Sequence, residues 1–170
     1  MADGTIGPMK LYVMRHGPAG NRGDMPNDGE RPLTGEGKQE TRQAARGLKA
    51  LKVKPRVILS SPLKRACQTA EIAAEELTGG KLQVVEALAS GAAPADIVNA
   101  LQLQTDDAMI VGHDPDFSVL ISCLLAGIEK PFLDFSKSGV VALEFDGAPK
   151  PSGGVLLWYL RRGQLAQLGH

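Results

Sequence analysis

The sequence predicts an α/β fold, a three-layer α/β/α sandwich around a mostly parallel central sheet. Short apolar runs alternate along the chain with longer segments whose apolar residues recur at helical spacing. Several of these runs stop abruptly at a polar or glycine-containing sequence, as strands do when they lead into a loop. Strands that alternate with helices favour a layered fold with parallel strands.

Length and composition are those of one globular domain. The chain has 170 residues, of which 43% are hydrophobic and 22% charged. A chain of this length buries about 70% of its unfolded surface, enough for a core without disulfides. We expect a single domain over residues 9–170, preceded by a flexible lead-in over residues 1–8 that lacks the features of a signal peptide.

The first expected strand is the apolar run Lys10–Met14, which ends at Arg15-His16-Gly17. A loop rich in Gly, Asp, Asn and Pro follows, and Thr34 is placed to cap a helix over Gly35–Lys52. The apolar face of that helix consists of Ala44, Ala45, Leu48 and Leu51.

A second strand, Val57–Leu59, is followed by Ser61-Pro62, a helix cap with proline at the first helical position. That helix is expected to run to Leu77 and to end at Gly79-Gly80. Its inward residues are expected to be Ala66, Ala70, Ala73, Ala74 and Leu77.

The second half of the chain continues the alternation. The last two strands are joined by a turn-rich stretch, so we expect an antiparallel or edge pair. The expected elements are a strand over Leu82–Val85, a helix over Pro94–Leu103, a strand over Ala108–Val111, a helix over Phe117–Leu125, and strands over Ser138–Phe145 and Val155–Leu160.

Charge and cysteine content exclude several classes of function. Basic and acidic residues number 19 each and aromatic residues make up 4%, so we expect no nucleic-acid binding. The longest nearly apolar run, Val119–Ile128, is too short to cross a bilayer. Cys67 and Cys123 lie in apolar helical patterns and are expected to be buried free thiols, which suits the cytoplasm. The sequence leaves the oligomeric state open.

Three polar segments directly follow predicted strands. They are Arg15-His16-Gly17, the stretch from Ser60 to Arg65, and Gly112-His113-Asp114. Because ligands of open α/β sheets bind beyond the carboxyl ends of the strands, these segments converge on one pocket if their strands are neighbours. A neutral imidazole is a competent nucleophile, and the arginine fork suits phosphate oxygens. The alternative for His16 is a hydrogen-bonded structural histidine beside a surface arginine.

These segments resemble the motifs of the histidine phosphatase superfamily, which has the phosphoglycerate mutase-like fold. LYVMRHGPAG at 11–20 is similar to its opening signature, RPLTGEG at 31–37 to the lead into its first helix, SSPLKRACQTAE at 60–71 to its second motif, and VGHDPDF at 111–117 to its late motif. The small size of the chain is typical of the SixA-type phosphohistidine phosphatase branch.

The resemblance implies a role for each matching residue. His16 would attack phosphorus and become transiently phosphorylated, Arg15 and Arg65 would clamp the phosphoryl oxygens, and His113 would stabilise the transition state. Water would then hydrolyse the phosphorylated histidine. Family members need no metal or other cofactor, so none is expected.

The general acid and a further phosphate ligand are less sharply defined. Glu86 follows the third strand, where the family carries its acid, but a solvent-facing glutamate at a strand end is the alternative. Arg31 either reaches the rim of the phosphate site or pairs with a loop acid. Other possible acids are Asp24, Asp28 and Asp114. Because imidazole leaves more easily than an alkoxide, a missing acid points toward phosphohistidine.

Two other kinds of chemistry fit the sequence less well. Asp114–Ser118 (DPDFS) is faintly similar to the loop of magnesium-dependent aspartyl-phosphate hydrolases, and His113, Asp114 and Asp116 could ligate a cation, although loop capping also explains both aspartates. No arginine lies six residues after Cys67 or Cys123, which excludes cysteine-phosphatase chemistry.

The sequence therefore predicts a phosphatase without a metal that acts on phosphohistidine of a signalling protein. The alternatives are a phosphatase of small phosphomonoesters or phosphosugars, and a catalytically inactive module that binds phosphorylated ligands.

Overall fold

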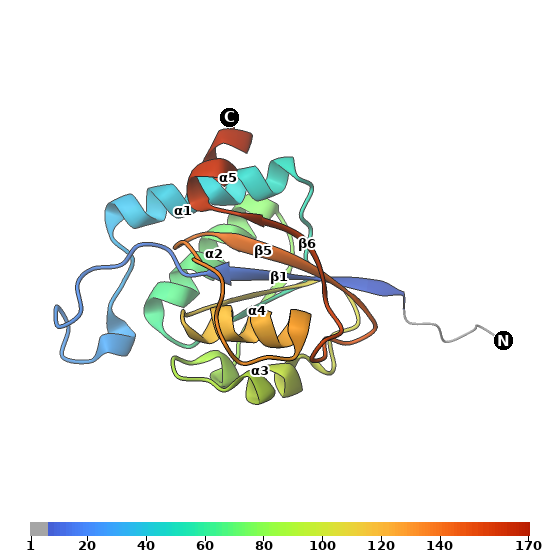
Figure 1. Ribbon diagram of the computed structural model, residues 1–170. Coiled ribbons are helices and arrows are strands. Elements are labelled where there is room, and N and C mark those ends of the chain that lie inside the picture. The colour runs from blue at the N-terminus through green and yellow to red at the C-terminus, as the bar shows by residue number, and fades with distance from the viewer. Residues whose placement is uncertain (1–6) are drawn as a thin grey trace.

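The computed structural model describes residues 7–170 and has one six-stranded sheet with the strand order β3-β2-β4-β1-β5-β6 (Figure 1). The pairs β3·β2, β2·β4 and β4·β1 are parallel, whereas β5 is antiparallel to both β1 and β6. This confirms the predicted mostly parallel sheet and the antiparallel pair at its end. The strands are β1 (Pro8–Arg15), β2 (Val57–Ser60), β3 (Lys81–Val84), β4 (Ala108–Gly112), β5 (Val140–Asp146) and β6 (Val155–Leu160).

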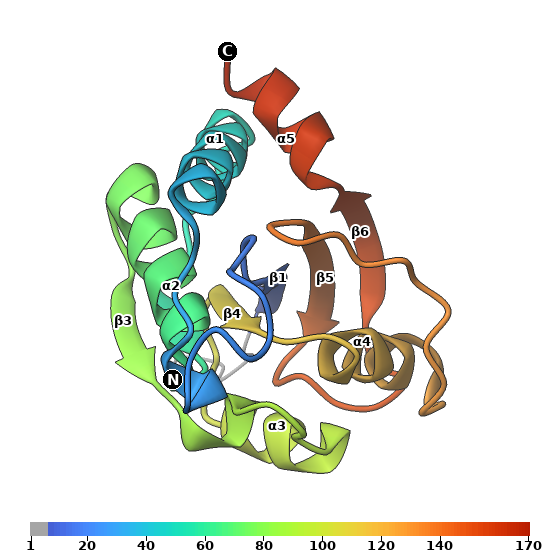
Figure 2. The same cartoon turned by 90° about the vertical axis from the view of Figure 1, so that its left-hand side faces the viewer.

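Helices cover both faces of the sheet. Figure 2 shows α1 and α2 on one side and α3 and α4 on the other, with α5 next to α1. The helices are α1 (Gly35–Ala50), α2 (Lys64–Leu77), α3 (Pro94–Leu101), α4 (Asp116–Ala126) and α5 (Arg162–Leu168), with 3₁₀ turns η1 (Asp28–Glu30) and η2 (Glu86–Leu88). No helix among residues 7–170 is long and apolar enough to span a membrane.

The central strand β1 explains why the sequence shows continuous apolar runs. Leu11 and Val13 point into the core beneath α3 and α4, whereas Tyr12 and Met14 point into the core beneath α1 and α2. Successive side chains of a strand face opposite sides of the sheet, so a strand covered on both faces is apolar throughout.

The first helix is close to the prediction. The Thr34 hydroxyl accepts a hydrogen bond from the Gly37 N–H at 2.8 Å, which confirms the cap. However, α1 ends at Ala50 rather than Lys52, and Leu51 is 39% exposed instead of inward. Ala44, Ala45 and Leu48 are fully buried as predicted.

The second helix begins at Lys64, and Leu63 rather than Ser61 occupies its N-cap position. The predicted cap is therefore wrong. The Ser61 N–H donates to the Val111 carbonyl at 2.9 Å, which continues the β2·β4 pairing and keeps Ser61 extended.

Several element ends also differ from the prediction. β1 begins at Pro8, inside the expected lead-in, whose residues 1–6 lie outside the described part. α3 stops at Leu101, and β5 starts at Val140 because Ser138 has a φ of 57°. Ala74 and Cys67 are only half-buried, so their predicted burial is wrong. Cys123 is buried as predicted, and both cysteines are free thiols.

The short helix α5 and the two 3₁₀ turns were not predicted. Leu165 is the one buried residue of α5, so seven residues carry too little apolar periodicity to indicate a helix. The signal that exists is its capping box, in which Gln164 accepts a hydrogen bond from the Arg161 N–H at 2.9 Å.

Candidate active site

The three polar segments singled out in the sequence meet at one edge of the sheet. Strands β2, β4 and β1 are neighbours and parallel, and their register pairs Ser60 with Val111 and Arg15 with Gly112. Their carboxyl ends therefore lie side by side, at the edge that Figure 2 turns toward the viewer. A pocket of about 260 Å³ opens there. It is lined by Arg15, His16, Ala19, Gly20, Asn21, Arg22, Arg31, Arg65, Ser90, His113, Asp114 and Lys137.

The His16 side chain is held as a neutral imidazole. It is 8% exposed, and its Nδ1 lies 2.7 Å from the Gly17 carbonyl oxygen. Because a carbonyl only accepts hydrogen bonds, Nδ1 carries the proton and Nε2 keeps its lone pair. Burial lowers the pKa of His16 to about 3, and the nearby His113, Arg65 and Arg15 act in the same direction. The His16 ring is therefore neutral at neutral pH, with an unprotonated Nε2.

Gly17 allows the chain to turn at the end of β1. A Cβ at this position would collide with the Thr41 hydroxyl and would lie 3.0 Å from the Ser138 hydroxyl. The Gly17 N–H donates to the Thr69 hydroxyl at 3.0 Å. This close approach to α1 and α2 fixes the carbonyl that holds the His16 ring.

The second histidine faces the first, with 5.3 Å between the ring centroids of His16 and His113. His113 Nε2 lies 2.7 Å from the Ser61 hydroxyl, which also accepts the Leu63 N–H at 3.2 Å. Among residues 7–170, His113 Nε2 is the one acceptor within reach of the Ser61 hydroxyl. The hydroxyl therefore donates its proton to Nε2, and the proton of the His113 ring stays on Nδ1. Burial, followed by the charge of Arg65, lowers the pKa of His113 to about 4.

Two arginines complete the inner wall, the half-buried Arg15 and the buried Arg65. Arg15 donates through Nη1 to the Phe135 carbonyl at 2.6 Å, and Arg65 donates through Nη1 to the Asp28 carbonyl at 3.0 Å. In the described part of the chain, three buried polar nitrogens have no partner: the Nε atoms of these arginines and His113 Nδ1. Unpartnered buried polar nitrogens are rare in proteins, and the three residues that carry these all line the pocket, which suits the binding of a phosphoryl group.

Arg31 lies at the pocket and also pairs with an acid of the loop, as one of its two sequence interpretations predicts. It lines the pocket, yet its Nε pairs with the Asp28 carboxylate at 2.9 Å and its Nη1 donates to the Gly20 carbonyl at 2.7 Å. Asp28 also pairs with Arg65, at 3.3 Å. The hydrogen bond from Arg31 lowers the pKa of Asp28, so this carboxylate stays ionised and braces both guanidinium groups.

Glu86 is not among the residues that line the pocket of the two histidines. It lies in η2 and lines a neighbouring hollow that shares Ser90 with the pocket. Asp24 accepts the Asn21 N–H at 2.7 Å. Asp114 lines the pocket and accepts hydrogen bonds from the backbone and side chain of Ser118 in α4.

The cation alternative has little support in the geometry. Asp114 is engaged by Ser118, and Asp116 accepts the Gly91 N–H at 2.8 Å. Within residues 7–170, no group of three or more His, Cys, Asp or Glu side chains is placed to hold a metal ion. Asp114 and Asp116 both accept hydrogen bonds from backbone N–H groups, which agrees with loop capping, the alternative to cation binding.

Sequence reasoning missed Ser61 as a functional residue. The sequence predicts a helix cap at Ser61, and nothing in it indicates a side-chain partner 52 positions further along the chain. The same holds for Arg22 and Lys137, which line the pocket from separate loops.

Comparison with known proteins agrees with this geometry. Residues 11–90 match the model of the histidine phosphatase superfamily (branch 1). A protein of Picosynechococcus sp. is 36% identical over 82% of this chain and 87% of its own, and the phosphohistidine phosphatase SixA of Escherichia coli is 31% identical over 82% and 88%. A solved structure of the protein histidine phosphatase SixA complexed with tungstate has a TM-score of 0.81 and 29% identity, covering 92% of this chain and 99% of that one.

The chain belongs to the histidine phosphatase superfamily, and its resemblance to the SixA-type branch is confirmed. The predicted α/β fold of the phosphoglycerate mutase-like kind and the predicted hydrolase class are confirmed with it.

The lowered pKa values of His16 and His113 predict that stability depends on pH. Unfolded histidine has a pKa near 6.5, so below that pH the unfolded chain binds protons that the folded chain does not. We expect the free energy of unfolding to fall from pH 7 to pH 5 by about 1–2 kcal/mol for each imidazole. Urea titrations of the wild type and of a His16→Gln/His113→Gln variant measure this. An equal decrease in both proteins would contradict the assignment of the effect to these rings.

The hydrogen bond between Ser61 and His113 predicts a loss of activity when the hydroxyl is removed. In Ser61→Ala the Nε2 atom of His113 loses its partner, and its ring proton is no longer held on Nδ1. We expect the phosphatase rate to fall about tenfold or more. Ser60→Ala is the matched control, because Ser60 is also buried but donates to the Ser61 carbonyl. Equal rates in the two variants would exclude this role.

Proposed function

We propose that the chain hydrolyses phosphohistidine on a partner protein through a phosphohistidine intermediate on His16. The observation that carries the proposal is the neutral His16 ring, whose Nε2 is free for attack in a pocket lined by arginines. A nucleophile of this kind next to unpartnered cationic donors suits phosphoryl transfer better than any other reaction class.

The first half-reaction follows from the groups that line the pocket. His16 Nε2 attacks phosphorus, a P–N bond forms on His16, and the P–N bond to the substrate imidazole breaks. Arg15, Arg65 and the Nδ1–H of His113 donate to the phosphoryl oxygens, whose charge is spread in the transition state. The leaving imidazole takes up a proton from the solvent.

Water completes the reaction in the second half. It attacks phosphorus, the P–N bond to His16 breaks, and inorganic phosphate leaves with the neutral ring restored. The bond from Nδ1 to the Gly17 carbonyl orients the ring in both steps. It also favours the imidazole that departs with its Nδ1 proton in place.

The arrangement of acids supports a nitrogen leaving group. Glu86 lines a different hollow, and Asp114 is engaged by Ser118, so neither is set up as a proton donor at phosphorus. An alkoxide needs such a donor more than an imidazole does. The similarity to the phosphohistidine phosphatase SixA of Escherichia coli points the same way.

Two alternatives from the sequence stay open to test. Hydrolysis of small phosphomonoesters or phosphosugars would use the same residues with another leaving group. An inactive module that binds phosphorylated ligands is disfavoured by the orientation of His16, which binding alone does not require. We also propose a cytoplasmic setting, because Cys67 and Cys123 are free thiols.

Phosphate release in EDTA tests the proposal with a histidine-phosphorylated protein domain and with 4-nitrophenyl phosphate. We expect faster release from the phosphohistidine protein and a loss of at least about a thousandfold in His16→Asn, since the covalent route then closes. Glu86→Gln is the control and should stay within about threefold of the wild type.

Faster turnover of the ester would assign the enzyme to small phosphomonoesters. Activity that persists in His16→Asn would contradict the proposed mechanism.

A further inference from the structure

The pocket carries more positive charge than a single phosphoryl group requires. Arg15 and Arg65 supply the unpartnered donors, and Arg31 is paired with Asp28. Two more cations, Arg22 and Lys137, line the same pocket, whereas Asp114 is its one carboxylate among the described residues. Within residues 7–170 neither Arg22 nor Lys137 forms an ion pair. Arg22 and Lys137 are therefore available to contact the parts of the substrate next to its phosphoryl group.

Lys137 is an exposed side chain on a rigidly held loop. The residue two positions before it, Phe135, is buried and accepts the hydrogen bond of Arg15. Its other neighbour, Ser138, is fully buried, donates through its N–H to the Arg15 carbonyl at 3.1 Å and contacts the Thr41 hydroxyl at 2.9 Å. The loop therefore fixes where the ammonium group stands, while the side chain remains accessible.

The surroundings of the pocket differ in charge from one side to the other. Lys137 also lines an adjoining hollow of about 290 Å³, whose other charged members are Arg161 and Arg162. The hollow that adjoins through Ser90 is lined by Glu86 and Asp96 and by no basic residue. A segment that crosses the active site thus meets a basic side and an acidic side.

Lys137 lies among the arginines of the basic side. Partial burial and the charges of Arg15, Arg31 and Arg162 lower the pKa of Lys137, so its ammonium lies close to other cations. Arg161 and Arg162 are paired with Asp134 at 2.9 Å and Glu40 at 2.6 Å. The uncompensated charge on this side is therefore that of Lys137.

We propose that Lys137 is a specificity-determining residue that binds carboxylates on one flank of the phosphohistidine, so that the preferred protein substrate carries Asp or Glu on the flank that lies over Lys137. The inference rests on the proposed phosphohistidine activity. Attraction between the Lys137 ammonium and substrate carboxylates would act mainly on the encounter and binding of the substrate. Salt screens this attraction, because the lysine side chain is exposed.

Two phosphohistidine peptides that differ only in flanking Asp and Glu against Asn and Gln test this inference, with free phosphohistidine as a third substrate. At low salt we expect the wild type to favour the acidic peptide by about 3–10-fold in kcat/KM, chiefly through KM, and by less than about twofold in 0.5 M salt. Lys137→Gln should abolish the preference, and Lys137→Glu should invert it.

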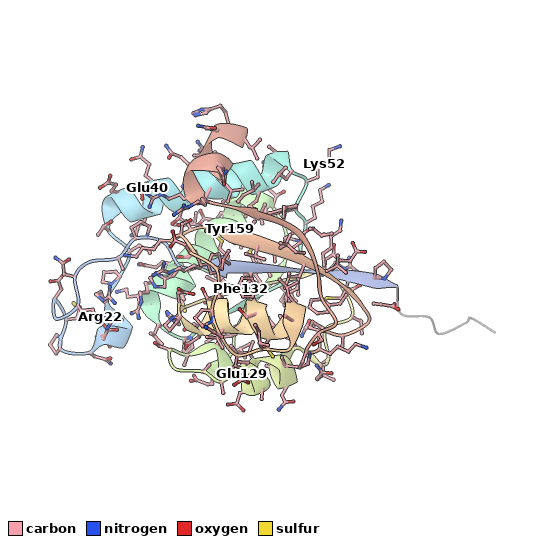
Figure 3. All side chains as sticks on the ribbon, in the orientation of Figure 1. Arg22, Glu40, Lys52, Glu129, Phe132 and Tyr159 are labelled. Carbon is pink, nitrogen blue, oxygen red and sulfur yellow. The ribbon has the colours of Figure 1, made fainter. Side chains whose placement is uncertain are left out.

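Lys52→Gln is the matched control, because it removes one lysine charge at a site that Figure 3 shows far from Arg22. It should keep the wild-type preference. Equal rates of the wild type on both peptides, or a preference that survives in Lys137→Glu, would overturn the inference while leaving the proposed function intact. A wild type that hydrolyses none of the three substrates would overturn the proposed function and this inference together.

Discussion

The site depends on the parallel pairing of β4 with both β1 and β2. That register sets Arg15 against Gly112 and Ser60 against Val111, so the polar residues that follow these strands emerge at one level. Backbone bonds extend the pairing beyond the strands, from the His16 N–H to the Gly112 carbonyl and from the Ser61 N–H to the Val111 carbonyl, both at 2.9 Å. Because these bonds belong to the sheet, the positions of both histidines and Ser61 are coupled to the buried core.

The electrostatics of the pocket follow from that placement. Burial beside Arg15 and Arg65 disfavours a charged imidazole, so the His16 ring stays neutral where a free histidine would be partly protonated. The arginines are in turn braced by the Phe135 carbonyl and by Asp28, whose ionised carboxylate pairs with two guanidinium groups. The same surroundings thus keep the proposed nucleophile, His16, unprotonated and hold the cations that would bind a phosphoryl group.

Local patterns predicted the strands, four of the five helices and the histidines at the strand ends, because apolar periodicity and strand-end position are encoded within a few residues. Partners distant in the sequence were beyond such patterns. The sequence around Ser61 indicates a helix cap, and only the fold shows its backbone bond to Val111. The position of Glu86 after a strand does not reveal that η2 places it in a hollow beside the pocket. Lys137 depends on a loop whose position is set by bonds to β1 and α1.

The most direct test of the account is to trap the phosphorylated enzyme. Wild-type protein mixed with a histidine-phosphorylated domain and quenched in alkali, where phosphohistidine survives, would be mapped by mass spectrometry. We expect one phosphoryl group, on His16, that forms and decays at rates compatible with turnover. Phosphorylation of His113 or Asp114 instead, or turnover without a phosphorylated His16, would contradict it.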